Sequence, residues 1–126
     1  MAEGIAKAME LPGYGFLSAG TAPVIGLPAT AEAVLVAAEV GADLDGHLAR
    51  DLSSLERIPP DEVLVMEPHH ATAVLRSLPE LAGNVHLLDP AGAAIADPYG
   101  RSVADYRETR DRIVAALEFH ARRWRI

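Results

Sequence analysis

Apolar residues along this chain follow two patterns, which are segments with helical spacing and short unbroken runs. Helical spacing predicts amphipathic helices, whereas short runs bounded by glycine, proline or polar residues predict strands. In chain order, the predicted elements are a helix over 2–10, a strand at 15–19, a helix over 31–40, a strand at 62–66, a helix over 68–78, a strand at 85–88 and a last helix after Ser102. Strands and helices therefore alternate.

Residues at the ends of the predicted helices support these boundaries. Thr30 and Ser102 each precede a helical segment and carry the hydroxyl oxygen that caps free backbone N–H groups. Asp105 occupies the third helical position after Ser102, as in a capping box. Pro68 suits the first position of its helix, and Gly41 is a typical stop.

The alternation of strands and helices predicts the fold class. Residues 62–66 form a continuous apolar run, typical of a strand that is buried on both faces of a parallel sheet. Parallel strands joined by helices through right-handed crossovers give an open α/β sheet with helices on both faces. The segments 21–28 and 89–100 are rich in proline and glycine and are predicted to be loops. With no internal repeat or linker in the sequence, we predict one domain over residues 1–126.

Composition narrows the classes of function. The chain has 126 residues, of which 50% are apolar and 23% charged, so it is a folded domain rather than a polar tail. A net charge of −7 argues against a nucleic-acid binder, which needs a basic surface. No apolar run approaches the roughly 18 residues that cross a bilayer. Residues 1–9 lack the apolar core of a signal peptide, so we expect a soluble cytoplasmic protein.

Three polar residues are candidates for a site. Asp97 precedes a proline, which favours an extended backbone and can direct the carboxyl group into a cleft as a general acid requires. Taken alone, this segment also fits an ordinary turn before a helix. Ser18 ends a predicted strand, where open α/β sheets bind ligands. His47 lies in an irregular polar loop beside Arg50, as either a surface histidine or one that orients another group.

Metal and thiol chemistry find little support in the sequence. There is no cysteine, which excludes disulfides, thiolate metal sites and a cysteine nucleophile carried by this chain. His69 and His70 are adjacent at a predicted helix start, and neighbouring helical residues point about 100° apart. We therefore interpret this pair as surface residues and predict no metal site.

Six stretches of the sequence carry a resemblance to a known family. They are Met1-Ala2-Glu3, Ser18-Ala19-Gly20-Thr21, Gly26-x-Pro28-Ala29, Gly46-His47-x-Ala49-Arg50, Val63-Leu64-Val65-Met66-Glu67, and Asp97-Pro98-Tyr99-Gly100 followed by Ser102 and Tyr106. In this order and spacing they resemble the low-molecular-weight protein tyrosine phosphatases, a family that includes protein-arginine phosphatases and related arsenate reductases. The resemblance covers essentially all 126 residues.

The resemblance implies a fold and a reaction. The fold is a flavodoxin-like three-layer sandwich around a parallel sheet, and the reaction is phosphomonoester hydrolysis through a phosphocysteine intermediate. Asp97 would protonate the leaving oxygen, Tyr99 would form a wall of the substrate cleft, and Ser18 and His47 would hold the phosphate-binding loop in shape. The implied substrate is a phosphorylated protein or a small phosphomonoester, with no metal or other cofactor.

The chain also departs from the family pattern. The family's first, central strand and its Cys-x5-Arg loop come immediately before the stretch that matches Met1-Ala2-Glu3, so we expect both to be missing and this polypeptide to be inactive. Three explanations remain open: a start assigned to a downstream methionine, which we favour, a pseudophosphatase that binds without chemistry, and completion by a separate fragment.

Loss of a central strand would be costly. Such a strand buries about four large apolar side chains, each worth roughly 1.5–3 kcal/mol. The total approaches the stability of a whole domain, about 5–15 kcal/mol. We therefore expect a rearranged sheet, a strand-donating partner or a homo-oligomer.

Overall fold

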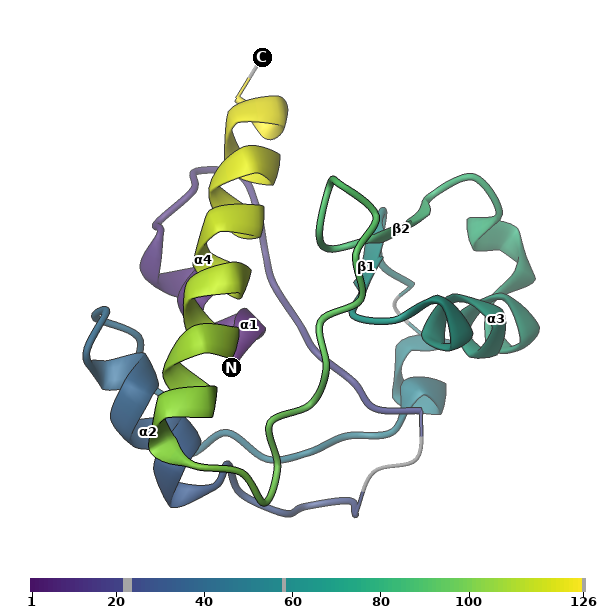
Figure 1. Ribbon diagram of the computed structural model, residues 1–126. Helices are drawn as coiled ribbons and strands as arrows, with labels where there is room; N and C mark the ends of the chain where they lie inside the picture. Colours follow the sequence, from purple (N-terminus) through teal and green to yellow (C-terminus); the bar gives the residue numbers. More distant parts are fainter. Residues whose placement is uncertain (22–23, 58, 126) are drawn as a thin grey trace.

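A computed structural model describes residues 1–21, 24–57 and 59–125 of the chain. Its helices and strands follow the predicted order, with one exception discussed below (Figure 1). The elements are α1 (Ala2–Ala8), α2 (Ala31–Ala38), the 3-10 helix η1 (Leu52–Leu55), β1 (Val63–Val65), α3 (Pro68–Ser77), the 3-10 helix η2 (Pro79–Leu81), β2 (Val85–Leu87) and α4 (Val103–Trp124). None of the helices in these ranges is long and apolar enough to span a membrane.

The helices begin and end at the capping residues predicted from the sequence. The Thr30 side chain accepts a hydrogen bond from the Ala33 N–H at the start of α2. Ser102 and Asp105 form a complete capping box at the start of α4, each binding the other's backbone N–H. Pro68 is the first residue of α3, and Gly41 follows α2 with a positive φ of 81°. Short-range signals therefore determine these boundaries.

The sheet is smaller than the sequence predicts. β1 and β2 pair in parallel with Val63 opposite Val85 and Val65 opposite Leu87, and they form a two-stranded sheet. Residues 15–19, predicted to be a strand, have no strand structure, so that prediction is wrong. The physical reason is that a strand needs a hydrogen-bonded neighbour. The nearest regular pairing of this segment is one isolated parallel bridge between Gly20 and Asp51.

The loop prediction for 21–28 is confirmed where the structure describes it. Residues 24–28 are irregular apart from an isolated antiparallel bridge between Pro28 and Leu48. Ala22 and Pro23 lie outside the described residues.

Buried side chains form two separate clusters. The larger cluster lies among α1, α2 and α4 and includes Val36, Ile113 and Leu117, together with Leu88 and Ile95 from the segments around the 89–100 loop. The smaller cluster lies where α3, η1 and η2 pack around the two strands, and it is formed by Leu52, Leu55, Val65, Val74, Leu78 and Leu81. Figure 1 shows the same division, with α1, α2 and α4 on one side and the strands and α3 on the other.

Helix α4 links the two sides through polar contacts. The buried His120 places Nε2 2.8 Å from the Leu88 carbonyl oxygen, just after β2. Its Nδ1 lies 3.0 Å from a guanidinium nitrogen of Arg123, and Arg123 also pairs with Glu62 before β1. Because a guanidinium can only donate, His120 Nδ1 accepts and Nε2–H donates to Leu88. This places the neutral His120 tautomer between the two halves of the fold.

The His120 link gives a stability prediction. His120→Ala leaves the buried Leu88 carbonyl without its donor, which costs about 1–3 kcal/mol of unfolding free energy. His86→Ala on β2 is the matched control because His86 is exposed, and its change should stay within about 0.5 kcal/mol. Urea unfolding measures both variants, and equal losses would contradict a bridging role for His120.

Candidate functional site

The Glu3 carboxylate on α1 contacts side chains from α1 itself, from the segment 15–19 and from the loop 43–50. Ser18 Oγ donates to Glu3 Oε1 at 2.9 Å, and Lys7 Nζ donates to Oε2 at 2.9 Å. His47 Nδ1 lies 3.6 Å from the same Oε2. Ser18 and His47, both predicted from sequence to support the site, therefore meet on one carboxylate. Its side chain is only 9% exposed.

The charge state of Glu3 follows from this arrangement. Burial alone would raise the pKa of the carboxyl group, but hydrogen bonds from Lys7 and Ser18 and the charges of Lys7 and His47 outweigh it. The pKa of Glu3 is therefore held below its ordinary value of 4.5. Glu3 stays ionised at neutral pH and acts as a fixed acceptor for the groups around it.

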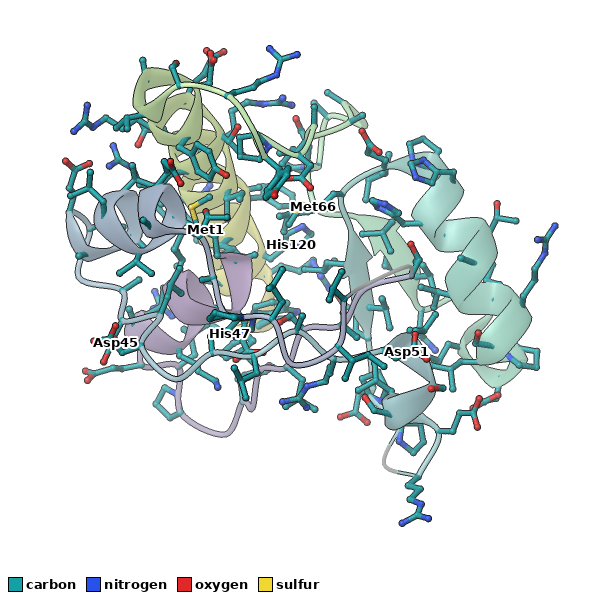
Figure 2. All side chains as sticks on the ribbon, turned by 90° about the horizontal axis from the view of Figure 1, so that it is seen from below. Met1, Asp45, His47, Asp51, Met66 and His120 are labelled. Atoms are coloured by element: carbon teal, nitrogen blue, oxygen red, sulfur yellow. The ribbon has the colours of Figure 1, made fainter. Side chains whose placement is uncertain are left out.

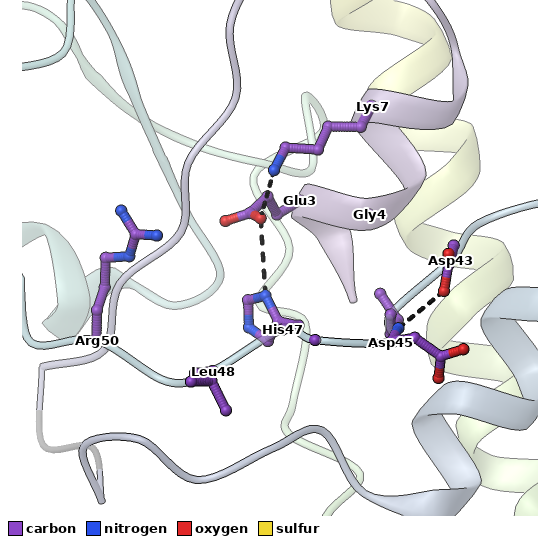
Figure 3. Close-up of a pocket in the computed structure, with 10 residues that line it drawn as sticks. Glu3, Gly4, Lys7, Asp43, Asp45, His47, Leu48 and Arg50 are labelled. Atoms are coloured by element: carbon purple, nitrogen blue, oxygen red, sulfur yellow. Dashed lines mark hydrogen bonds and ion pairs between the residues drawn. The ribbon is translucent and has the colours of Figure 1, made fainter.

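A cavity of about 360 Å³ opens beside this cluster (Figure 3). It is lined by Glu3, Gly4 and Lys7 of α1 and by residues 43–48 and Arg50 of the following loop. The loop approaches α1 closely because position 4 has no side chain: a Cβ there would overlap the Leu44 side chain. The lining carries charges of both signs, as a site for a polar group requires.

The loop that carries His47 is shaped by local turns. Asp43 Oδ1 accepts the Asp45 N–H at 2.8 Å, and the His47 N–H donates to the Leu44 carbonyl. Gly46 takes a φ of 78°, which other residues adopt only with strain. This geometry turns the His47 ring back toward α1, as the dashed line to Glu3 in Figure 3 shows.

Asp97 lies close enough to the start of α1 for its charge to act on the Met1 amino group. Burial lowers the pKa of the Met1 amino group below 8.0, while the nearby charges of Glu3 and Asp97 act in the other direction. Asp97 is exposed, and its Oδ1 accepts the Tyr99 N–H at 3.0 Å in a turn that Pro98 anchors by being buried. Of the predicted site residues, Asp97 therefore lies near the Met1 amino group, and Ser18 and His47 meet on Glu3.

The structure does not bring Tyr99 into this group. Its side chain is 70% exposed on the loop before α4. Figure 2 shows Met1 and His47 on the helical side of the molecule and Asp51 toward the α3 side, with Met66 between them. A role for Tyr99 at the cleft wall stays a prediction.

Glu3 and Lys7 were not predicted as site residues. Their i, i+4 spacing on a helix is a common surface ion pair and carries no functional signal by itself. The contacts that distinguish Glu3 come from Ser18 and His47, which are 15 and 44 positions away along the chain. Sequence spacing alone does not show such contacts.

Comparisons with known proteins identify the family of this chain. The family model for low molecular weight phosphotyrosine protein phosphatase matches residues 1–123. Wzb of Escherichia coli K12, a low molecular weight protein-tyrosine-phosphatase, is 36% identical over 109 residues, covering 85% of this chain and 71% of Wzb.

Solved structures give the same result. Vibrio vulnificus Wzb in complex with benzylphosphonate superposes with a TM-score of 0.89 at 30% identity, covering 97% of this chain and 87% of that one. The YwlE arginine phosphatase of Geobacillus stearothermophilus gives 0.90 at 25% identity, covering 98% and 82% respectively.

The parallel strands and the helices that pack around them define an α/β protein. The chain belongs to the low-molecular-weight phosphotyrosine protein phosphatase family. The family and fold that the sequence resemblance implied are thereby confirmed.

The depressed pKa of Glu3 predicts a pH dependence of stability. A lowered folded-state pKa stabilises the protein above the unfolded value near 4.5, and this contribution is lost as pH falls through the folded pKa. The unfolding free energy of the wild type should therefore fall as the pH drops below about 5 and on through the lowered folded-state pKa, and Glu3→Gln should make that fall smaller. Glu108→Gln, at an exposed position on α4, is the matched control. Equal pH profiles for the wild type and Glu3→Gln would contradict the assignment.

Proposed function

We propose that this chain contributes the proton donor and the positioning residues of a phosphomonoester hydrolase of the tyrosine phosphatase type. The observation that supports this proposal is the family match over residues 1–123, together with the convergence of Ser18 and His47 on Glu3. The proposed substrates are phosphorylated proteins, with small phosphomonoesters as surrogates. Asp97 is the proposed general acid and Tyr99 the proposed wall of the substrate cleft.

The proposed chemistry assigns Asp97 two proton transfers. When a cysteine thiolate attacks phosphorus, the ester P–O bond breaks and Asp97 gives its proton to the leaving oxygen. Water then attacks the phosphocysteine, Asp97 takes a proton from that water, the P–S bond breaks and phosphate is released. The Glu3 cluster supports this chemistry from outside, because it fixes α1 relative to residues 18 and 47.

The thiolate is not supplied by this polypeptide, which has no cysteine. We therefore propose that the polypeptide alone does not hydrolyse phosphomonoesters by the phosphocysteine route. The alternative function, a pseudophosphatase that binds without turnover, is favoured by one observation, the open edge of β1.

The open edge follows from the pairing of β1. The Val63 N–H donates to Asn84, and the Val65 carbonyl accepts from Leu88. In a parallel ladder alternate residues face the same neighbour, so the N–H and C=O of Leu64 point to the opposite edge. Among the described residues no strand pairs with that edge. We propose that a strand from a partner, or from a second copy of the chain, pairs there.

Amide exchange tests the strand proposal. In dilute monomer the Leu64 amide should exchange roughly tenfold or more faster than the Val65 amide, which faces β2. Leu64 should become protected when a partner or second copy binds, and light scattering gives the assembly state of the same samples. A Leu64 amide that is already protected in the monomer, or that stays unprotected in an assembled form, would count against strand pairing at this edge.

Turnover tests the catalytic proposal. The purified chain should not hydrolyse p-nitrophenyl phosphate, a phosphotyrosine peptide or a phosphoarginine peptide. Adding a peptide with an apolar strand followed by Cys-x5-Arg should restore hydrolysis, since it supplies a thiolate nucleophile and a strand for the open edge of β1. With the peptide present, Asp97→Asn should lower the rate by about 10²–10⁴-fold, the usual contribution of a general acid.

The matched control is Asp61→Asn, which changes an exposed aspartate before β1. Ordinary turnover by the chain alone would overturn the proposed inactivity. A restored rate that Asp97→Asn and Asp61→Asn leave equally unchanged would overturn the role of Asp97.

A further inference from the structure

Two histidines and a glutamate meet at the corner between β1 and α3, apart from the residues around Glu3. Glu67, His69 and His70 each offer one ligand atom, and these atoms all lie within 4.8 Å of one another. His69 Nδ1 is 3.5 Å from Glu67 Oε2, and the two imidazole rings are 4.2 Å apart between centroids. The expectation that adjacent histidines diverge is therefore not met at this corner.

The backbone at the start of α3 explains why the rings converge. Glu67 is the N-cap residue, and its extended backbone (φ −137°, ψ 153°) places its side chain outside the helix. Pro68 fixes φ at the first helical position. The His70 N–H then donates to the Glu67 carbonyl at 3.0 Å and closes the turn. The carboxylate therefore sits beside the two rings and makes no capping hydrogen bond.

We propose that Glu67, His69 and His70 bind a divalent transition-metal ion, with Zn²⁺ as the best match. Imidazole nitrogen and carboxylate oxygen are both good zinc ligands, at about 2.0–2.2 Å from the ion. Two such ligands in a tetrahedral site lie about 3.4 Å apart, close to the 3.5 Å between His69 and Glu67. Three protein ligands leave a fourth position for water or an external ligand.

Charge and exposure are compatible with this site. The first turn of a helix disfavours a cation, but the Glu67 carboxylate supplies a negative charge at the same point. Glu67 and His70 are partly buried and His69 is exposed, so the rings can rotate to close the remaining distance while the ion is reached from solvent. The Glu67–His69 ion pair is the side-chain contact that metal binding would replace.

The proposed metal site is connected through the backbone to the loop that carries Asp97. Met66, immediately before Glu67, accepts a hydrogen bond from the Ile95 N–H at 2.9 Å. Ile95 is buried and lies two residues before Asp97. A metal that fixes residues 67–70 therefore also steadies the attachment point of the loop that carries Asp97. This inference concerns metal binding alone and stands whether or not the chain takes part in phosphatase chemistry.

Calorimetric titration of the untagged full chain with ZnCl₂ tests the site. One zinc ion per chain is expected. Glu67→Gln, His69→Asn and His70→Asn should each weaken binding by about tenfold or more, because loss of a ligand costs at least as much as loss of its supporting contacts. His86→Asn, at an exposed histidine on β2, is the matched control and should bind as the wild type does.

Histidine NMR of the unmodified protein provides a readout that needs no variant. Zinc should shift the ring signals of His69 and His70 and leave those of His86 unchanged. Failure to bind zinc, zinc shifts that spare His69 and His70, or affinities equal to the wild type in all three ligand variants would each overturn the proposal.

Discussion

Within residues 1–21, 24–57 and 59–125, β1 pairs on one side only, and this is the constraint on which the rest of the structure depends. A two-stranded parallel sheet is rarely stable by itself, so its stability must come from what packs around it. On one side the small apolar cluster around α3, η1 and η2 fulfils this need. On the other side Leu64 and Met66 reach the larger cluster of α1, α2 and α4, and the link through His120 and Arg123 adds polar contacts. Packing against helices on both sides therefore stabilises the small sheet.

The same constraint shapes the candidate site. Without a neighbouring strand, residues 15–19 cannot be positioned by a backbone ladder, and Ser18 is held by its side chain instead. Glu3 thus joins α1, the segment of Ser18 and the loop of His47 through one ionised carboxylate. Asp97 reaches the region from a loop that is fixed at Ile95 by Met66 and by Arg112, which binds both Asp89 and the Ala94 carbonyl. Asp97 and the residues around Glu3 are consequently positioned by different parts of the chain.

Much of the fold could be predicted from sequence because its signals are local. Thr30, Pro68 and Ser102 mark helix starts through contacts within three or four residues. The resemblance pointed to Ser18 and His47, which meet on Glu3, and the role of Asp97 stays a prediction. The prediction of a strand at 15–19 was wrong although the segment is partly apolar, because neither strand of the two-stranded sheet pairs with it. Glu3 was missed because its partners come from distant segments. The two histidine rings lie closer together than regular helical spacing predicts, because the first turn of α3 follows an extended cap.

Lys7 has a consequence beyond the hydrogen bond that it donates to Glu3. It is the only lysine among the eleven basic residues, so side-chain amine chemistry on this polypeptide has a single target. That target is more than half exposed, and it stands one helical turn from the carboxylate that gathers Ser18 and His47. Acylation there would remove a cationic donor from Glu3 while leaving every arginine contact along α4 intact. The chain thus offers a single side-chain amine for a label or a tether, and this amine lies beside the cavity.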